Sequence, residues 1–165
     1  MSATEAFIAE LTQEAATTRR VLERVPEGQL SWRPHPKSMS LGQLAAHIAG
    51  LPRGIALLLK ELTVEPPRVP LPEPTSTAEI VALLDEAVPF AIERLKEWGD
   101  EGLAQVWSLS RGGKTLLQLP RLAVFRSVML NHWYHHRGQL TVYLRLLDVA
   151  LPSVYGPTAD DQIFG

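Results

Sequence analysis

Apolar residues recur along most of this chain at the three- and four-residue spacing that places side chains on one face of an α-helix. The pattern predicts four helices, over about residues 3–25, 41–62, 78–98 and 120–148. Period-two alternation, which would indicate strands, is almost absent. We therefore expect an all-α protein, an up-and-down four-helix bundle formed by a single domain over residues 1–165.

The first three predicted helices begin with the same signal. A serine precedes the apolar pattern, and an acidic or amide side chain follows three residues later, so that each side chain can cap the backbone of the other residue. The three pairs are Ser2 with Glu5, Ser40 with Gln43, and Ser76 with Glu79. Gly99 is expected to end the third helix.

Two prolines fall inside predicted helices. Pro52 and Pro89 each remove a backbone hydrogen bond, so each should bend its helix. For Pro89 the simplest interpretation is a bundle bent to fit its core. Pro52 follows His47 by just over one turn, so there the bend is also a candidate for shaping a pocket.

The composition narrows the possible functions. With 16 basic and 18 acidic residues the net charge is −2, and the arginines are scattered, which argues against nucleic-acid binding. Cysteine is absent, so there is no disulfide, thiol nucleophile or cysteine-built metal site, and we expect a cytoplasmic protein. The longest apolar run, "IALLLKELTV", is interrupted by Lys60 and Glu61, so we expect no membrane span.

One loop resembles a nucleotide-binding motif but lacks its essential parts. The segment "SLSRGGKTLLQ" contains Gly-Lys-Thr, yet Ser108 stands where a phosphate-binding loop needs its first glycine, and no strand pattern precedes it. We interpret Gly112 and Gly113 as a tight turn instead.

Three of the five histidines of the chain lie within the segment "NHWYHHRGQL", at residues 132, 135 and 136. His132 and His136 are four residues apart, which is the spacing of a chelating pair on one face of a helix. The residues that share their face are Phe125, Val128, Met129, Gln139, Tyr143 and Leu147. Buried imidazoles need partners, and a divalent metal ion would satisfy both at once.

A metal site inside a bundle needs a further ligand from another helix, and His47 in "LGQLAAHIAGL" is the candidate. Spacing alone leaves open a pairing of His132 with His135, and it also leaves open hydrogen-bonded core histidines without metal. His35 lies between two prolines and is expected at the surface. Trp133 stands where a zinc protease has its glutamate, so that class is not indicated.

Taken together, "LGQLAAHIAGL", "NHWYHHRGQL" and the ending "LPSVYGPTADD" resemble the DinB/YfiT-like superfamily of metalloenzymes, over nearly the whole chain. This is the damage-inducible bundle family and not the DNA polymerase of the same name. The resemblance implies a four-helix bundle, commonly a homodimer, with a divalent ion, often zinc or nickel. By motif position it implies His47, His132 and His136 as ligands and His135 as a non-ligand.

Characterised relatives include thiol-dependent S-transferases and isomerases that use bacillithiol, mycothiol or glutathione. The leading hypothesis is therefore a metal-dependent S-transferase that acts on a small thiol and an electrophilic small molecule. The alternative is a non-catalytic, metal-stabilised binding or stress-response protein, and a metal-free interaction bundle is a third interpretation. Gln43, Asn131 and Gln139 are candidates for supporting the ligands. The catalytic acid or base stays unknown.

A dimer surface is predicted on the opposite face of the last helix, where apolar and basic residues are mixed. Its residues are Leu130, Tyr134, Arg137, Thr141, Leu144 and Arg145. The tail "YGPTADD" and Pro52 are the sequence's candidates for shaping the pocket.

Overall fold

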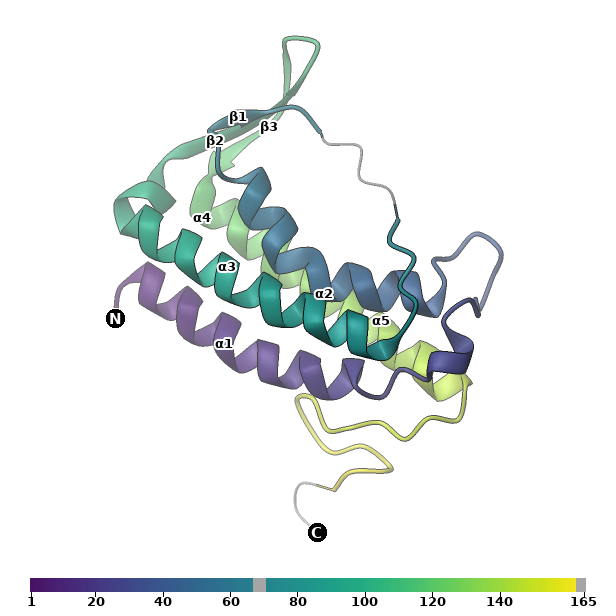
Figure 1. Cartoon of the computed structure of the whole chain (residues 1–165). Helices are drawn as coiled ribbons and strands as arrows, with labels where there is room; N and C mark the ends of the chain where they lie inside the picture. The colour runs from purple at the N-terminus through teal and green to yellow at the C-terminus, as the bar shows by residue number, and fades with distance from the viewer. Residues whose placement is uncertain (67–70, 163–165) are drawn as a thin grey trace.

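Four long helices lie side by side in the computed structural model, which describes residues 1–66 and 71–162 (Figure 1). They are α1 (Ala3–Leu22), α2 (Leu41–Leu58), α3 (Thr77–Ala104) and a last helix in three consecutive parts, α4 (Arg121–Val124), the π-helical η2 (Phe125–Leu130) and α5 (Asn131–Leu146). A single turn of 3-10 helix, η1 (Glu27–Gln29), follows α1. The prediction of an all-α bundle is confirmed.

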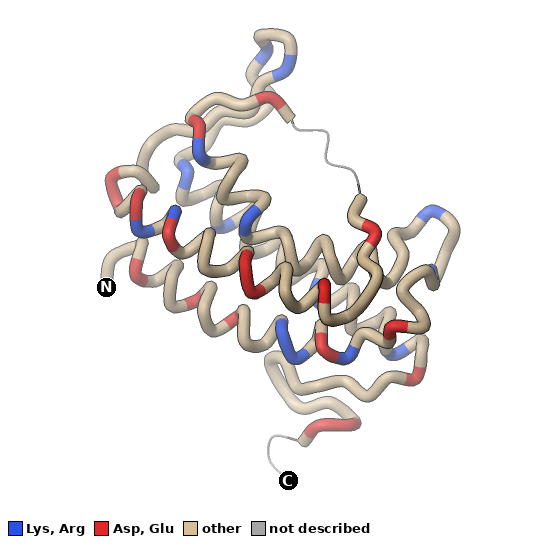
Figure 2. The backbone as a smooth tube through the Cα atoms, viewed as in Figure 1, with Lys and Arg blue, Asp and Glu red and all other residues tan. Residues whose placement is uncertain are grey.

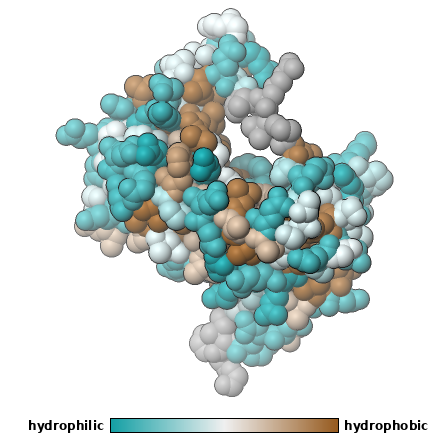
Figure 3. Space-filling view, in the orientation of Figure 1, coloured by the Kyte–Doolittle hydropathy of each residue, from teal (hydrophilic) through white to brown (hydrophobic). Residues whose placement is uncertain are grey.

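The core lies between the helices and consists of the apolar positions that recur at helical spacing. Burial of this surface is the main stabilising contribution to such a bundle. Fully or almost fully buried side chains come from every long helix and include Phe7, Leu11, Leu22, Leu44, Ile48, Ile80, Leu84, Leu95, Phe125 and Leu140. The outer surface is mostly hydrophilic on the face that Figure 3 shows. Acidic and basic residues are interspersed along the helices (Figure 2).

The predicted capping signals begin all three helices, but they are not equivalent. Ser2 and Ser40 each form a complete reciprocal box with the residue three positions later. Ser76 accepts a hydrogen bond from the backbone of Glu79, whereas the Glu79 carboxylate accepts one from the Thr75 backbone, at 2.7 Å. The third helix therefore has a cap that extends one residue further upstream than the sequence predicted.

A small three-stranded sheet was not expected, and the prediction of an almost strand-free chain is wrong at this point. β1 (Thr63–Val64) pairs parallel to β2 (Val106–Arg111), which forms an antiparallel hairpin with β3 (Lys114–Pro120). Gly112 and Gly113 have φ angles of 57° and 78°, which residues with a side chain rarely adopt, so the predicted tight turn is correct. The hairpin projects beyond one end of the bundle (Figure 1).

The third helix is longer than predicted because it does not stop completely at Gly99. The backbone there has φ 55° and ψ −172°, a conformation essentially restricted to glycine, and a further helical turn continues to Ala104. Pro52 and Pro89 both lie inside helices, as expected.

The π-helical turn η2 changes which face of the last helix is buried. A π-turn takes up an extra residue, so positions before and after it no longer follow one straight-helix pattern. Before and within it, Phe125 and Met129 are buried as predicted. After it, Trp133 and Leu140 point into the core, and His132 with its neighbours lies at the edge of the buried face.

The same shift overturns the predicted dimer surface on the last helix. Leu130 and Leu144 are fully buried, and the Arg137 side chain is 2% exposed. These residues belong to the interior of one chain and do not offer an outer surface. Tyr134 is half-buried and donates a hydrogen bond to Glu10 of α1 at 2.7 Å.

The C-terminal tail crosses α1 and α5 on the side away from α2 (Figure 1). Arg20 donates a hydrogen bond to the Ser153 carbonyl at 3.0 Å, and the Tyr155 hydroxyl donates one to Glu14 at 2.9 Å. The tail therefore closes the α1 side of the last helix. It does not shape a pocket at the histidines, which face α2, so that part of the sequence-based interpretation is wrong. Along the described ranges, no helix combines the length and apolarity that a membrane crossing requires.

Candidate metal centre

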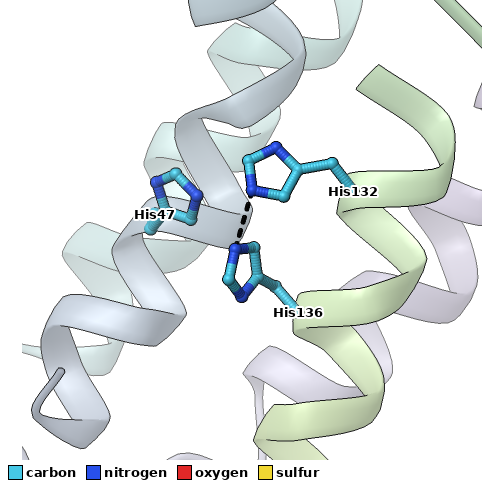
Figure 4. A group of neighbouring side chains, drawn as sticks. All are labelled: His47, His132 and His136. Carbon is cyan, nitrogen blue, oxygen red and sulfur yellow. Dashed lines mark hydrogen bonds between the residues drawn. The ribbon is translucent and has the colours of Figure 1, made fainter. Parts of the chain in front are cut away.

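The structure brings together the three predicted histidines from two helices. His47 extends from the middle of α2, and His132 and His136 extend from successive turns of α5 (Figure 4). One ring nitrogen of each lies within 4.8 Å of the corresponding atom of the other two. The ring centroids are 4.5 to 5.3 Å apart. All three side chains are half-buried at the boundary between α2 and α5.

The ring of His136 has one nitrogen held by a neighbour and the other directed into the group. Nδ1 of His136 lies 2.9 Å from Gln139 Oε1, an atom that can only accept, so Nδ1 carries the proton. The backbone of Val128, in the π-helical turn one turn earlier, partly opposes the lowering of the His132 pKa. Contacts such as that of His136 with Gln139 fix the tautomer and orientation of metal-binding histidines.

The Nε2 atoms of the two α5 histidines face each other. Nε2 of His132 and Nε2 of His136 are 2.7 Å apart (Figure 4). At this distance one neutral imidazole donates a hydrogen bond to the other, and the tautomers decide which ring is the donor. A metal ion bound by both atoms would replace this hydrogen bond. The donor set fits a divalent metal because imidazole nitrogen is a preferred ligand of zinc and nickel.

The electrostatics of the group disfavour protonation of the three histidines. Burial, with the neighbouring His136 and His132 rings, lowers the pKa of His47 from 6.5 to about 4. Burial and His136 also lower the pKa of His132. Burial lowers the pKa of His136, although its bond to Gln139 partly opposes the shift. At neutral pH the three imidazoles are therefore neutral, which is the form that binds metal.

These lowered pKa values predict a pH-dependent stability of the metal-free protein. A folded-state pKa below the unfolded value means that the unfolded chain takes up more protons, so stability is complete above pH 6.5 and falls as the pH drops toward 4. For His47 the loss between pH 6.5 and about 5 should be on the order of 1 kcal/mol. Urea unfolding of apo wild-type and His47→Gln protein measures it. If the free energy of unfolding depends on pH equally in the two proteins, the prediction is contradicted.

The other candidate residues are placed differently. His135 is exposed. Its ring centroid lies 5.0 Å from that of His136, but His135 lies outside the group of three. The exposed His35 accepts a hydrogen bond from the Lys37 backbone in its loop. Gln43 caps α2 and donates to Glu73 at 2.6 Å, so its amide is directed away from the histidines.

Of the three polar residues expected to support the ligands, only Gln139 does so among the described hydrogen bonds. Asn131 is exposed. Gln139 is in turn 3.5 Å from the Tyr143 hydroxyl, which donates to the Met39 carbonyl at 3.4 Å. Tyr143 was assigned to the helix face from the sequence, but its support of Gln139 was not foreseen. The i, i+4 spacing of the two residues is the signal that could have revealed it.

Comparisons with known proteins agree with this fold. The sequence model of the DinB superfamily matches residues 10–140. The uncharacterised protein YrdA of Bacillus subtilis strain 168 is 28% identical over 150 residues, which is 90% of this chain and 85% of that protein. The chain belongs to the DinB superfamily.

Two solved structures have the same architecture. A DinB-like protein from Bacillus cereus ATCC 10987 superposes with a TM-score of 0.73 at 29% identity, covering 92% of this chain and 97% of that one. The DinB-like protein YjoA of Bacillus subtilis has a TM-score of 0.65 at 19% identity, covering 94% and 98% of the two chains. The second likeness concerns the fold alone.

Proposed function

We propose that His47, His132 and His136 hold one divalent metal ion, zinc or nickel, and that the protein is a metal-dependent enzyme of the thiol-dependent S-transferase type. The observation that carries the proposal is the group of three neutral imidazoles, whose ligand atoms lie within 4.8 Å of one another. Within the described residues, no carboxylate joins the group. A site with three protein ligands keeps a coordination position for a small molecule, as catalytic sites do.

The bound ion would supply Lewis acidity and favour the thiolate form of a thiol. The three imidazoles bind the ion, and Gln139 fixes the ring of His136 so that Nε2 is directed toward it. All three histidine side chains are partly buried. The thiol and an electrophilic partner as substrates come from the family resemblance, since characterised relatives include S-transferases and isomerases of this type.

A non-catalytic role is the second candidate. The histidines join α2 to α5, so a bound ion would also tie these two helices together and stabilise the bundle. A metal-stabilised binding or stress-response protein would need no free coordination position. The two functions therefore differ in whether a small molecule reaches the ion.

The test uses the cobalt-substituted protein. One cobalt ion per chain is expected, and a small cellular thiol should produce a sulfur-to-cobalt charge-transfer band in the near ultraviolet. Bacillithiol, mycothiol and glutathione are the thiols to titrate, with the corresponding S-methyl compounds as controls that have no ionisable thiol. One cobalt per chain with no band for any thiol would reject the transferase and favour the stabilising role.

A homodimer and a cytoplasmic location complete the proposal. The homodimer rests on the family resemblance alone, because the surface predicted for it is largely buried within the chain. The cytoplasmic location rests on the absence of cysteine.

A further inference from the structure

A hydrogen bond between α2 and α5 lies beside the three histidines. The indole Nε1–H of Trp133 donates to the backbone carbonyl of Ile48 at 2.8 Å. Both side chains are fully buried. A carbonyl in the middle of a helix normally accepts the backbone N–H four residues later, so a side-chain donor at this position needs an explanation.

Pro52 provides the explanation. It is the fourth residue after Ile48 and has no backbone N–H, so the helical partner of the Ile48 carbonyl is missing. A proline ring at this position also crowds the carbonyl four residues earlier. A buried carbonyl without a partner is strongly unfavourable, and the Trp133 indole supplies the missing donor.

The position of this bond relates it to the metal centre. Ile48 follows His47 directly, and Trp133 follows His132 directly. The bond therefore joins the two helices one residue away from a proposed ligand on each side. Because the bond has a defined length and direction, it sets how far α2 lies from α5 and how the two helices are rotated at the level of the histidines.

We propose that Trp133 is a positioning residue, which uses the carbonyl that Pro52 leaves free to fix His47 against His132 and His136. The proposal deepens the proposed function and rests on it where metal affinity is concerned. The arrangement of the histidine rings can be measured without metal, so the positioning role of Trp133 and the proposed function can fail separately.

The first experiment compares two buried tryptophans. Trp133→Phe keeps most of the ring volume but removes the donor. Trp107→Phe is the matched control, because Trp107 is 1% exposed and its indole N–H donates to the Leu58 carbonyl of the same helix α2, at 3.3 Å. Trp133→Phe should weaken cobalt binding by about 10- to 100-fold and change the visible spectrum of the cobalt site, whereas Trp107→Phe should leave both unchanged. Equal affinity and spectra in Trp133→Phe and the wild type would overturn the proposal.

The second experiment tests the role of Pro52. Pro52→Ala restores an N–H that can donate to the Ile48 carbonyl within the helix, so the carbonyl no longer depends on Trp133. Adding Trp133→Phe to Pro52→Ala should therefore weaken cobalt binding by a smaller factor than adding it to the wild type. The double variant should also lose less thermal stability than Trp133→Phe alone. The same factor in both backgrounds would mean that the two residues act independently.

A third measurement separates positioning from metal binding. In the metal-free wild type, the His47 and His136 rings have centroids 4.8 Å apart, so nuclear Overhauser contacts between their ring protons should be observed. These contacts should weaken in Trp133→Phe and persist in Trp107→Phe. If they weaken while the wild type binds no metal, the positioning role holds and the proposed function fails. Contacts that persist in Trp133→Phe would overturn the positioning role.

Discussion

Replacing His47, His132 or His136 by alanine is expected to weaken the retention of a divalent ion by more than about 100-fold, since losing an outer-shell partner of a ligand already costs about 10- to 100-fold. The physical reason is that each ring supplies one of the three nitrogens that converge within 4.8 Å. With two ligands left, water replaces the third and the ion exchanges freely. Metal analysis after dialysis, together with competition titration against a chelator of known affinity, measures the change.

His135→Ala is the matched control for these variants. It removes an imidazole from the same turn of α5, but one that is exposed and outside the group of three. It should retain about one ion per chain with unchanged affinity. Loss of the ion in His135→Ala and its retention in His132→Ala or His136→Ala would show that the ligand assignment is wrong.

The sequence predicts the bundle well because the information that it needs is local. The spacing of apolar residues and the serine caps depend only on residues within a few turns of one another, so the positions of the helices follow from them. His132 and His136 are also a local pair, since their spacing alone places both rings on one side of a helix. Whether His47 meets these two rings depends on how α2 packs against α5. The sequence offered His47 as a candidate, and the family resemblance selected it together with His132 and His136 as the ligands.

What the sequence could not predict depends on non-local contacts. The π-helical turn η2 has no distinctive composition, so a straight-helix extrapolation put His132 and His136 on the buried face and did not include Trp133 in it. The β2–β3 hairpin was missed because its short strands have one partly buried face, with Trp107 as its only fully buried residue. Arg137 was assigned to the surface as a charged residue, because nothing near it in the sequence indicates its partner on α1.

That partner is Glu14, and breaking the pair should cause the largest loss of stability. The two side chains are 2% and 8% exposed, and Arg137 Nη1 lies 2.6 Å from Glu14 Oε2. Arg137 also donates to the Thr18 hydroxyl at 3.1 Å and to the Tyr155 hydroxyl, so the pair connects α1, α5 and the tail. Removing one member leaves the other charge buried without compensation.

Glu14→Ala should therefore lower the free energy of unfolding by about 3–5 kcal/mol, as measured by urea denaturation. Replacing both residues by apolar ones of similar size, as in Glu14→Leu with Arg137→Met, should recover most of the loss, because no buried charge is then left unpaired. The exposed ion pair of Glu93 with Lys96 provides the control, and Glu93→Ala should leave the midpoint unchanged. A similar small effect for Glu14→Ala would mean that water reaches Arg137 in solution, and that the tail does not close this side of the bundle.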